Sequence, residues 1–345
     1  MDFQLSDDQR ALRSGMRDLL GAVFDRDRMR AAVERGDRNR GMDRAGGGDR
    51  AGGVGRGGGV DRGLWRELGA AGFFVLRLPE EAGGVGLGLP EAVLLFEEAG
   101  RALLPGPLVA THLAAGLVKG AAEGEAVVTV AEGGGRAVAD LGGADAVLVA
   151  GGARVLTGEE LEAFVAGAVP VRSMDPLTPL HRTMGLAGAW EAYPGAFRGE
   201  GALLTAAEQL GSAARTTEMA VQHARSRAQF GSLIGSFQAV KHLCADMLAR
   251  TEPARSAVYA AAVTGDPVEI AAAKLLADEA AVRNARDCLQ IHGGMGFTWE
   301  ADVHLHLKRA WLRAARWLTA VEAEEVLAAD LGPVRPLYGG SAALG

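Results

Sequence analysis

Arg227-Ala228-Gln229-Phe230-Gly231 and Gln290-Ile291-His292-Gly293-Gly294-Met295-Gly296 are the two short sequences that decide the fold of this 345-residue chain. Both lie within the segment 206–310, and each lies where one long stretch of helical periodicity ends and another begins. Backbone amides that are free at helix ends, together with nearby polar side chains, can converge on a ligand. The sequence therefore predicts that these two loops form a ligand site and that the remaining chain is their scaffold.

Long helices are predicted on both sides of the two loops. The third of them opens with Asp266-Pro267 and Glu269, which supply an N-cap, a proline at the first helical position and a capping-box acid. The fourth is expected from Asp302 to Ala329. Two earlier helices are indicated by apolar residues at helical spacing, namely Leu204, Ala207, Leu210, Ala214, Thr217, Val221 and Ala224, then Phe237, Val240, Leu243, Met247 and Leu248. Four long helices with short connections predict an up-down bundle over 201–332, followed by a tail at 333–345.

The first 120 residues predict a helical domain. Ser6-Asp7-Asp8-Gln9 has the form of a capping box and opens an amphipathic helix. Residues 35–62 alternate Gly, Arg and Asp without apolar periodicity, which predicts a disordered insertion because such a segment cannot offset its ordering entropy. Arg/Gly-rich segments can contact RNA, but the interspersed aspartates and the lack of aromatics argue against that reading. Further helices are expected at 64–72, at 90–101 and up to residue 117, and the glycines of 80–89 are read as turns.

The middle of the chain predicts a small β domain over 121–200. Short β-type runs at 126–130, 146–149 and 154–156 are separated by Gly/Asp turns. The fold class expected for the whole chain is therefore mainly α, with a reduced β domain between two helical ones.

Composition excludes several classes of function. A formal net charge of -7 and a pI near 5.6 argue against nucleic acid or anionic membranes as partners. The sequence shows no leader and no apolar run of spanning length, so a cytoplasmic protein is expected. Cys244 and Cys288 lie among apolar residues, as buried thiols usually do. His304 and His306 are two residues apart and point to different faces of a helix, so no metal site is expected.

At this point the two loops resemble a known family. Arg227–Gly231, with Ile234-Gly235 and Phe237-Gln238 after it, resembles the signature that opens the C-terminal bundle of acyl-CoA dehydrogenases. Gln290–Phe297 resembles the second, glycine-bearing signature of that family. The resemblance is strong over 202–312, fair over 1–118 and poor between them.

The resemblance implies FAD at a subunit interface. Arg227 would offer a guanidinium fork to the pyrophosphate, and the glycines would let the backbone approach it. In the family the second loop serves the cofactor of a neighbouring subunit, which implies an oligomer. The alternative is that Gly231 and Gly293-Gly294 only end helices. The residues expected at the cofactor are Arg227, Gln229, Phe230, Gly231, Gln238, Gln290, Gly293, Gly294 and Gly296.

The expected reaction is α,β-dehydrogenation of an acyl-CoA thioester, in which a glutamate removes the α proton. The family places this glutamate where Arg316-Trp317-Leu318-Thr319 stands here, and a minority of members place it near Gly201. Neither position holds an acid. The arginine usual near the acyl-CoA is replaced by the apolar 202–204 run, and the Thr-Glu-Pro signature of the middle domain is missing.

Other acids can be weighed as substitutes, but none is assigned. Glu200 lies outside the predicted helix and is predicted to be a solvated acid in a loop. Glu208 reads as the ion-pair partner of a base on a neighbouring helix. Glu300 and Asp302, near the start of the last helix, read as capping acids.

The favoured hypothesis is one subunit of a hetero-oligomer, resembling short members that form tetramers with a longer acyl-CoA dehydrogenase subunit. The partner would supply the glutamate, and an electron-transfer flavoprotein would accept the electrons. Two alternatives stay open. One is a self-sufficient homo-oligomer or homo-tetramer with a relocated base, and the other is a structural or regulatory subunit without FAD.

Overall fold

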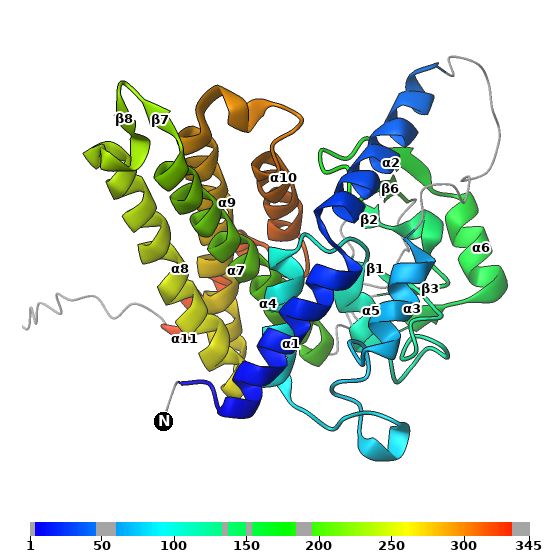
Figure 1. The fold of residues 1–345 in the computed structure, drawn as a ribbon. Coiled ribbons are helices and arrows are strands. Elements are labelled where there is room, and N and C mark those ends of the chain that lie inside the picture. The colour runs from blue at the N-terminus through cyan, green and yellow to red at the C-terminus, as the bar shows by residue number, and fades with distance from the viewer. Residues whose placement is uncertain (1–3, 46–59, 133–136, 150–153, 184–194, 333–345) are drawn as a thin grey trace, which may run out of the picture.

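The computed structural model describes residues 4–45, 60–132, 137–149, 154–183 and 195–332. An N-terminal group of helices and a middle region with small sheets lie beside a set of long C-terminal helices (Figure 1). The expected fold class, mainly α with a small β domain, is confirmed. Within the described residues, no helix combines the length and apolarity needed to cross a membrane.

Three long helices form the core of the C-terminal region. They are α7 (Gly195–Ser226), α8 (Gln238–Thr264) and α9 (Pro267–His292), which lie side by side in Figure 1. Alanines fill the contacts between them, so the axes approach closely; fully buried examples are Ala206, Ala213, Ala254, Ala277 and Ala281. The start of α9 is the predicted one, because Asp266 accepts hydrogen bonds from the N–H groups of Val268 and Glu269 and Pro267 is the first helical residue.

The prediction of one continuous fourth helix is wrong. The structure divides it into α10 (Val303–Ala314) and α11 (Ala320–Asp330). Between them Trp317 adopts a positive φ of 60°, and Thr319 with Glu322 forms a capping box that starts α11. Periodicity missed this break because the apolar Trp317 and Leu318 continue the helical pattern through the turn.

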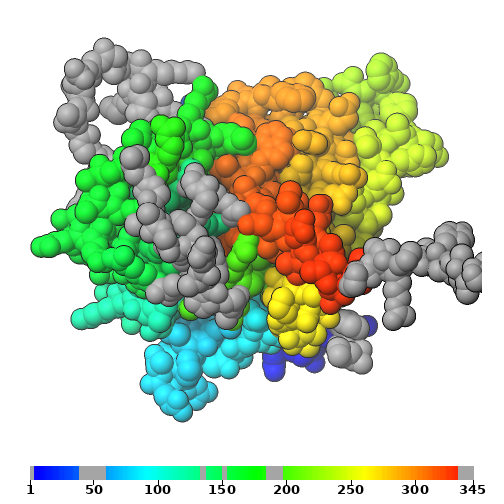
Figure 2. Space-filling view, turned by 180° about the vertical axis from the view of Figure 1, so that it is seen from behind, coloured from blue at the N-terminus to red at the C-terminus, as the bar shows by residue number. Residues whose placement is uncertain are grey.

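Helix α7 begins at Gly195, upstream of the 201–332 range predicted for the bundle. Glu200 therefore lies inside a helix, which corrects the prediction that it lies outside one. Seen from behind, the orange and red segment that contains α10 and α11 lies to the right of the green middle region and above the yellow end of α8 (Figure 2).

The N-terminal helices include one that the sequence did not predict. Helix α1 (Asp7–Val23) begins at the expected Ser6–Gln9 capping box. Helix α2 (Arg26–Ala45) continues well past Arg35, so the prediction of disorder from that residue is wrong as far as Ala45, and 46–59 lie outside the described residues. Tertiary packing explains α2: Val33 is fully buried, and a Cβ at Gly36 would overlap the carbonyl of Pro176.

The remaining N-terminal helices confirm the predictions. They are α3 (Arg62–Ala70), α4 (Leu89–Arg101) and α5 (Leu108–Ala114), and the glycine-rich 80–89 stretch forms turns with a short 3-10 helix, η2 (Glu80–Ala82). Aromatic side chains form their shared core, with ring centroids 5.0 to 5.4 Å apart along the chain Trp65, Phe74, Phe73 and Phe96. Helix α4 packs on α7, where Gly100 and Gly211 let the two backbones touch.

The middle region contains two three-stranded sheets. The first has the order β1 (Val128–Ala131), β3 (Ala146–Val149) and β4 (Arg154–Leu156), with β1 parallel to β3 and β3 antiparallel to β4. These are the three predicted strands. The second sheet, β2 (Val138–Ala139), β6 (Leu180–Arg182) and β5 (Val169–Val171), and the helix α6 (Gly158–Ala166) were not predicted. The strands of this second sheet are only two or three residues long, which is too short to give a periodic signal.

Candidate active site

The first signature loop is a tight hairpin after α7. Strand β7 (Ala228–Gln229) pairs with β8 (Ser232–Leu233), and Phe230 and Gly231 form the corner with φ of 54° and 77°. Positive φ at both corner residues matches the turn type that two-residue hairpins favour. A short 3-10 helix, η5 (Ile234–Ser236), then leads into α8. The side chain of Phe230 is 92% exposed, so the hairpin presents an aromatic ring at the surface.

The second signature loop follows α9 at the same end of the helix bundle (Figure 1). Gly293 ends α9 with a positive φ of 60°, and a short 3-10 helix, η6 (Gly293–Phe297), follows. No atom lies within 4 Å of a Cβ built at Gly293 or Gly294, so the backbone there faces open space. Both loops therefore leave backbone accessible to a ligand.

Two stacked histidines join the loops. The rings of His223, near the end of α7, and His292, at the end of α9, are 4.1 Å apart between centroids and tilted by 18°. His223 also accepts the backbone N–H of Arg227 through its carbonyl, at 2.9 Å. Burial lowers the pKa of His223, and the charges of His292 and Arg227 lower it further, which favours the neutral ring that stacks.

Four polar side chains around the two loops have no interaction partner among the described residues. Arg227, Gln229, Gln238 and Gln290 are exposed, and none of their side chains forms a hydrogen bond or ion pair with any residue that the structure describes. One guanidinium and three amides are thus available for an anionic ligand. This donor set fits a diphosphate-bearing cofactor.

A cavity of about 270 Å³ lies where the N-terminal, middle and C-terminal regions meet. Its walls come from the start of α5, from β1 and β2, from the segment before β6, from α7 and from α10 with the turn after it. Residues that matter below are Val130, Glu132, Asp140, Thr205, Glu208, Arg309, Arg313, Arg316 and Trp317. Most of the wall is apolar, and the charged groups are gathered on the α10 side and on the middle region.

Three arginines near the cavity are paired with three carboxylates. Arg309 binds Asp175, and Arg316 binds Glu132. The Arg313–Glu208 pair is 2.7 Å long and buried on both sides.

Two members of these ion pairs, Asp175 and Arg313, have shifted pKa values. Burial alone would raise the pKa of Asp175, but Arg309 and the hydrogen bonds from Thr178 and Leu177 outweigh it and lower the pKa. Burial lowers the pKa of Arg313 to about 10, although Glu208 opposes the shift. Arg313 therefore still carries its charge at neutral pH.

Asp140 is the carboxyl group of the cavity that has no such partner. It adopts a positive φ of 55° before the 3-10 turn η3 (Leu141–Gly143), and its side chain accepts no hydrogen bond from the described residues. Burial raises the pKa of Asp140 to about 7, while Arg309 and Arg316 oppose the shift. This group is therefore poised to exchange a proton near neutral pH.

The family resemblance places a glutamate either near Gly201 or within 316–319. One packing contact leaves no room for a glutamate at either position. A Cβ at Gly201 would lie 2.3 Å from the indole of Trp317, and Trp317 is almost fully buried. The backbone N–H of Trp317 donates to Glu132 at 2.6 Å, which fixes the turn. An indole over a glycine leaves no room for a carboxylate at either position.

Glu200 and Glu208, two of the acids considered as alternative bases, both form ion pairs. Glu200 forms a two-point ion pair with Arg77 at 2.7 and 3.0 Å, which corrects its reading as a solvated loop acid. Glu208 does lie on the cavity, and its predicted pairing with a base on a neighbouring helix is confirmed by Arg313.

The two acids near α10 lie outside the cavity wall. Glu300 is exposed. Asp302 stands at the N-cap position but makes no capping hydrogen bond, because its carboxylate binds Arg26 and Arg30 of α2 instead. The capping role predicted for Asp302 is therefore wrong.

Sequence reasoning missed Glu132, Asp140, Arg309 and Arg316. Glu132 directly follows β1, and Asp140 directly follows β2, so the ends of two short strands were the available signal. Arg309 lies in α10 and Arg316 in the turn after it, but only the folded chain brings the carboxylates from the middle region to them.

Comparison with known proteins decides the family. Residues 196–322 match the acyl-CoA dehydrogenase C-terminal domain, and residues 49–123 match the N-terminal domain of the same enzymes. The chain is 37% identical over 265 residues to acyl-CoA dehydrogenase IpdE2 of Mycobacterium tuberculosis, covering 72% of this chain and 80% of that protein. The chain belongs to the acyl-CoA dehydrogenase family.

Solved structures of acyl-CoA dehydrogenases share the fold. Butyryl-CoA dehydrogenase from Megasphaera elsdenii superposes with a TM-score of 0.74 at 20% identity, over 96% of this chain and 100% of that one. The ChsE4–ChsE5 complex from Mycobacterium tuberculosis gives 0.73 at 22% identity, over 97% and 100%. As a member of the acyl-CoA dehydrogenase family, the protein is an oxidoreductase with FAD as its cofactor.

Proposed function

We propose that this chain catalyses α,β-dehydrogenation of an acyl-CoA thioester as one subunit of a hetero-oligomer whose longer partner supplies the catalytic glutamate. The observation that carries the proposal is the closed contact between Trp317 and Gly201, which removes both expected base positions from this chain. The exposed loops at the other end of the bundle support it. Four polar side chains around them have no partners among the described residues, so they are available to complete the partner's site.

In this proposal the two signature loops hold the cofactor. Arg227 binds the pyrophosphate, with Gln229, Gln238 and Gln290 as further donors. Gly293 and Gly294 let the backbone N–H groups approach the phosphates, because no atom lies within 4 Å of a Cβ built at either residue. Gly296 is buried against Leu289 and His292 and shapes the loop from within. The hairpin corner of Phe230 and Gly231 covers an apolar part of the nucleotide. When bound, FAD accepts two electrons from the acyl group. An electron-transfer flavoprotein is the proposed acceptor of those electrons.

The similarity to heteromeric relatives supports the partner. The ChsE4–ChsE5 structure is a complex of two different chains, and its fold extends over 97% of this chain. A hetero-tetramer with a longer acyl-CoA dehydrogenase subunit is therefore the assembly that we propose, in the cytoplasm.

The test is to purify the chain alone and together with a longer acyl-CoA dehydrogenase homologue encoded beside it. Flavin absorbance, native mass and enoyl-CoA formation are measured on both samples. We expect a yellow complex that forms enoyl-CoA and a lone chain with little activity. Full activity of the lone chain would refute the partner's role, and a colourless, inactive complex would favour a purely structural subunit.

A further inference from the structure

We propose that the cavity where the three regions meet binds a small molecule with an apolar body and a carboxylate, which Arg309 and Arg313 hold through guanidinium N–H groups that have no other acceptor. The proposal concerns binding alone. It goes beyond the proposed function and does not depend on it, because it needs neither the two signature loops nor the cofactor.

Two buried guanidinium nitrogens lack an acceptor. They are Nη2 of Arg309 and Nη1 of Arg313, and neither forms a hydrogen bond with the residues that the structure describes. Both arginines line the cavity, and only 4% and 6% of their surfaces are exposed. A buried donor without an acceptor costs stability, and the cost is larger for a charged group, so each of the two N–H groups calls for an acceptor from a ligand or from water.

The other nitrogens of both guanidinium groups have partners that hold them in place. Arg309 binds Asp175 through Nε and donates to the carbonyl of Leu104 through Nη1 at 3.1 Å. Arg313 donates to Glu208 through Nη2 at 2.7 Å. Because the two arginines are four residues apart on α10, they lie on one face of the helix, with their Cβ atoms about 5–6 Å apart. Two charged donors on one helix face suit a single acceptor group that has two oxygens.

A carboxylate fits these donors better than a neutral carbonyl does. A hydrogen bond between a guanidinium and a carboxylate is about twice as strong as one between neutral groups. The charges of Glu208 and Glu132 on the wall are balanced by Arg313 and Arg316. Burial raises the pKa of Asp140 to about 7, so at mildly acidic pH this side chain is a neutral acid that does not repel an anion. The wall therefore accepts a negative charge below pH 7.

The rest of the wall defines the body of the ligand. It is lined by apolar side chains from all three regions, including Leu108, Val109, Val130, Leu180 and Leu312. The volume of about 270 Å³ is near the lower end of small-molecule sites, which begins at about 300 Å³. The cavity thus suits a short aliphatic chain or a ring with one acidic head group.

The experiment compares two probes that differ only in the head group. Octanoate and octanamide have the same aliphatic chain, but only octanoate has a charged head group with two equivalent oxygens. Binding of each probe to the purified 345-residue chain is measured by isothermal titration calorimetry at pH 6. We expect octanamide to bind at least about 10-fold more weakly than octanoate, because it loses the charge-assisted hydrogen bonds.

Two variants test whether the probe lies in the cavity. Val130→Phe adds a ring to the apolar wall without changing either arginine, and it should weaken octanoate binding at least about 10-fold by filling the space. Val169→Phe, at an exposed position on a strand of the same region, is the matched control and should bind octanoate as the wild type does. At pH 8 Asp140 is charged, so octanoate should bind up to about 10-fold more weakly than at pH 6, whereas octanamide binding should not change.

Any of four results would overturn the proposal. Equal affinity for the two probes shows that the arginines do not hold the head group, and full octanoate binding by folded Val130→Phe places the probe outside the cavity. Absence of binding by either probe leaves the two N–H groups to water. Octanoate affinity that is the same at pH 6 and pH 8 separates the head group from Asp140. If Val130→Phe does not fold, the head-group comparison and the pH dependence of the wild type decide.

Failure of the proposed function is distinct from failure of this proposal. The proposed function is judged by flavin absorbance and enoyl-CoA formation in the complex, and neither measurement involves octanoate or the Val130→Phe variant.

Discussion

Replacing Asp140 with asparagine is expected to stabilise the protein at neutral and alkaline pH and to have little effect at pH 4. The pKa of this carboxyl is about 7 in the folded chain and 3.8 in a solvated reference, so the folded state holds its proton over a wide range in which the unfolded state has lost it. The wild type therefore loses stability as pH rises from about 4 to 7, because ionisation is easier in the unfolded chain. An asparagine does not titrate and avoids this loss.

The magnitude follows from the two pKa values. Their difference, multiplied by 1.36 kcal/mol for each pH unit, gives about 4 kcal/mol above pH 7. This figure is an upper value, since water that enters the cavity solvates the carboxylate.

Urea unfolding measures the effect. The free energy of unfolding of wild type and Asp140→Asn is compared at several pH values between 4 and 8, with Glu81→Gln as the exposed-acid control. The difference between Asp140→Asn and wild type is expected to grow with pH by a few kcal/mol, whereas the control stays level. Parallel pH curves for wild type and Asp140→Asn would refute a buried, unpartnered carboxyl.

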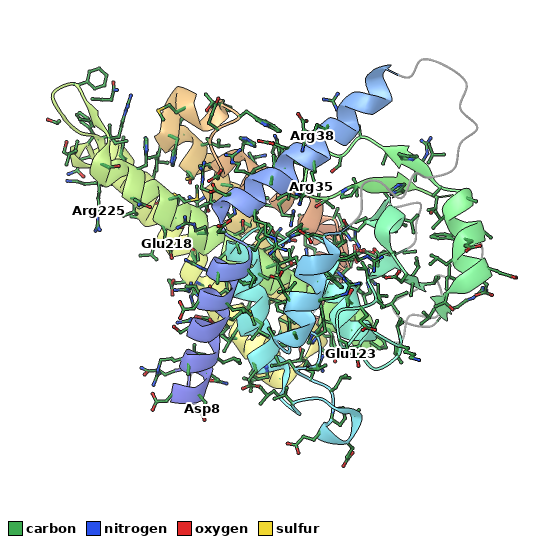
Figure 3. All side chains as sticks on the ribbon, turned by 45° about the vertical axis from the view of Figure 1, so that its right-hand side comes forward. Asp8, Arg35, Arg38, Glu123, Glu218 and Arg225 are labelled. Carbon is green, nitrogen blue, oxygen red and sulfur yellow. The ribbon has the colours of Figure 1, made fainter. Side chains whose placement is uncertain are left out.

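Three further predictions concern the loops and the bundle. Arg227→Ala is expected to weaken FAD binding roughly 10- to 100-fold by removing a charge-assisted hydrogen bond, measured by flavin titration. Arg225→Ala, on the outer face of α7 (Figure 3), is the matched control and should bind FAD normally. Glu208→Ala is expected to lower the free energy of unfolding by about 3 kcal/mol or more, because it leaves a buried guanidinium unpaired. Gly201→Ala is expected to cost about 1–3 kcal/mol in thermal unfolding by overlapping the indole, whereas Gly199→Ala, with its nearest atom at 3.6 Å, should cost less.

Local sequence signals were sufficient to predict much of the fold. The cap at Ser6 and the Asp266-Pro267 start of α9 depend on residues within one helical turn, so the sequence alone predicts them. The two signature loops were predicted for the same reason, since both are bounded by helix ends. Their common position at one end of the bundle then follows from the antiparallel packing of the helices.

Long-range contacts explain what the sequence did not reveal. Helix α2 is stabilised by burial of Val33 and by the approach of Gly36 to a residue 140 positions later, which no local pattern reports. The charged wall of the cavity likewise depends on pairs between distant segments, such as Arg316 with Glu132. The unpaired state of Asp140 becomes visible only when every neighbouring arginine has been matched to its partner.

The contact between Trp317 and Gly201 restricts how this chain can change in evolution. A glutamate introduced at position 201 collides with the indole, and removal of the indole alone leaves a void in the core. Regaining a carboxylate at position 201 therefore requires at least two substitutions, and an intermediate with either change alone is less stable.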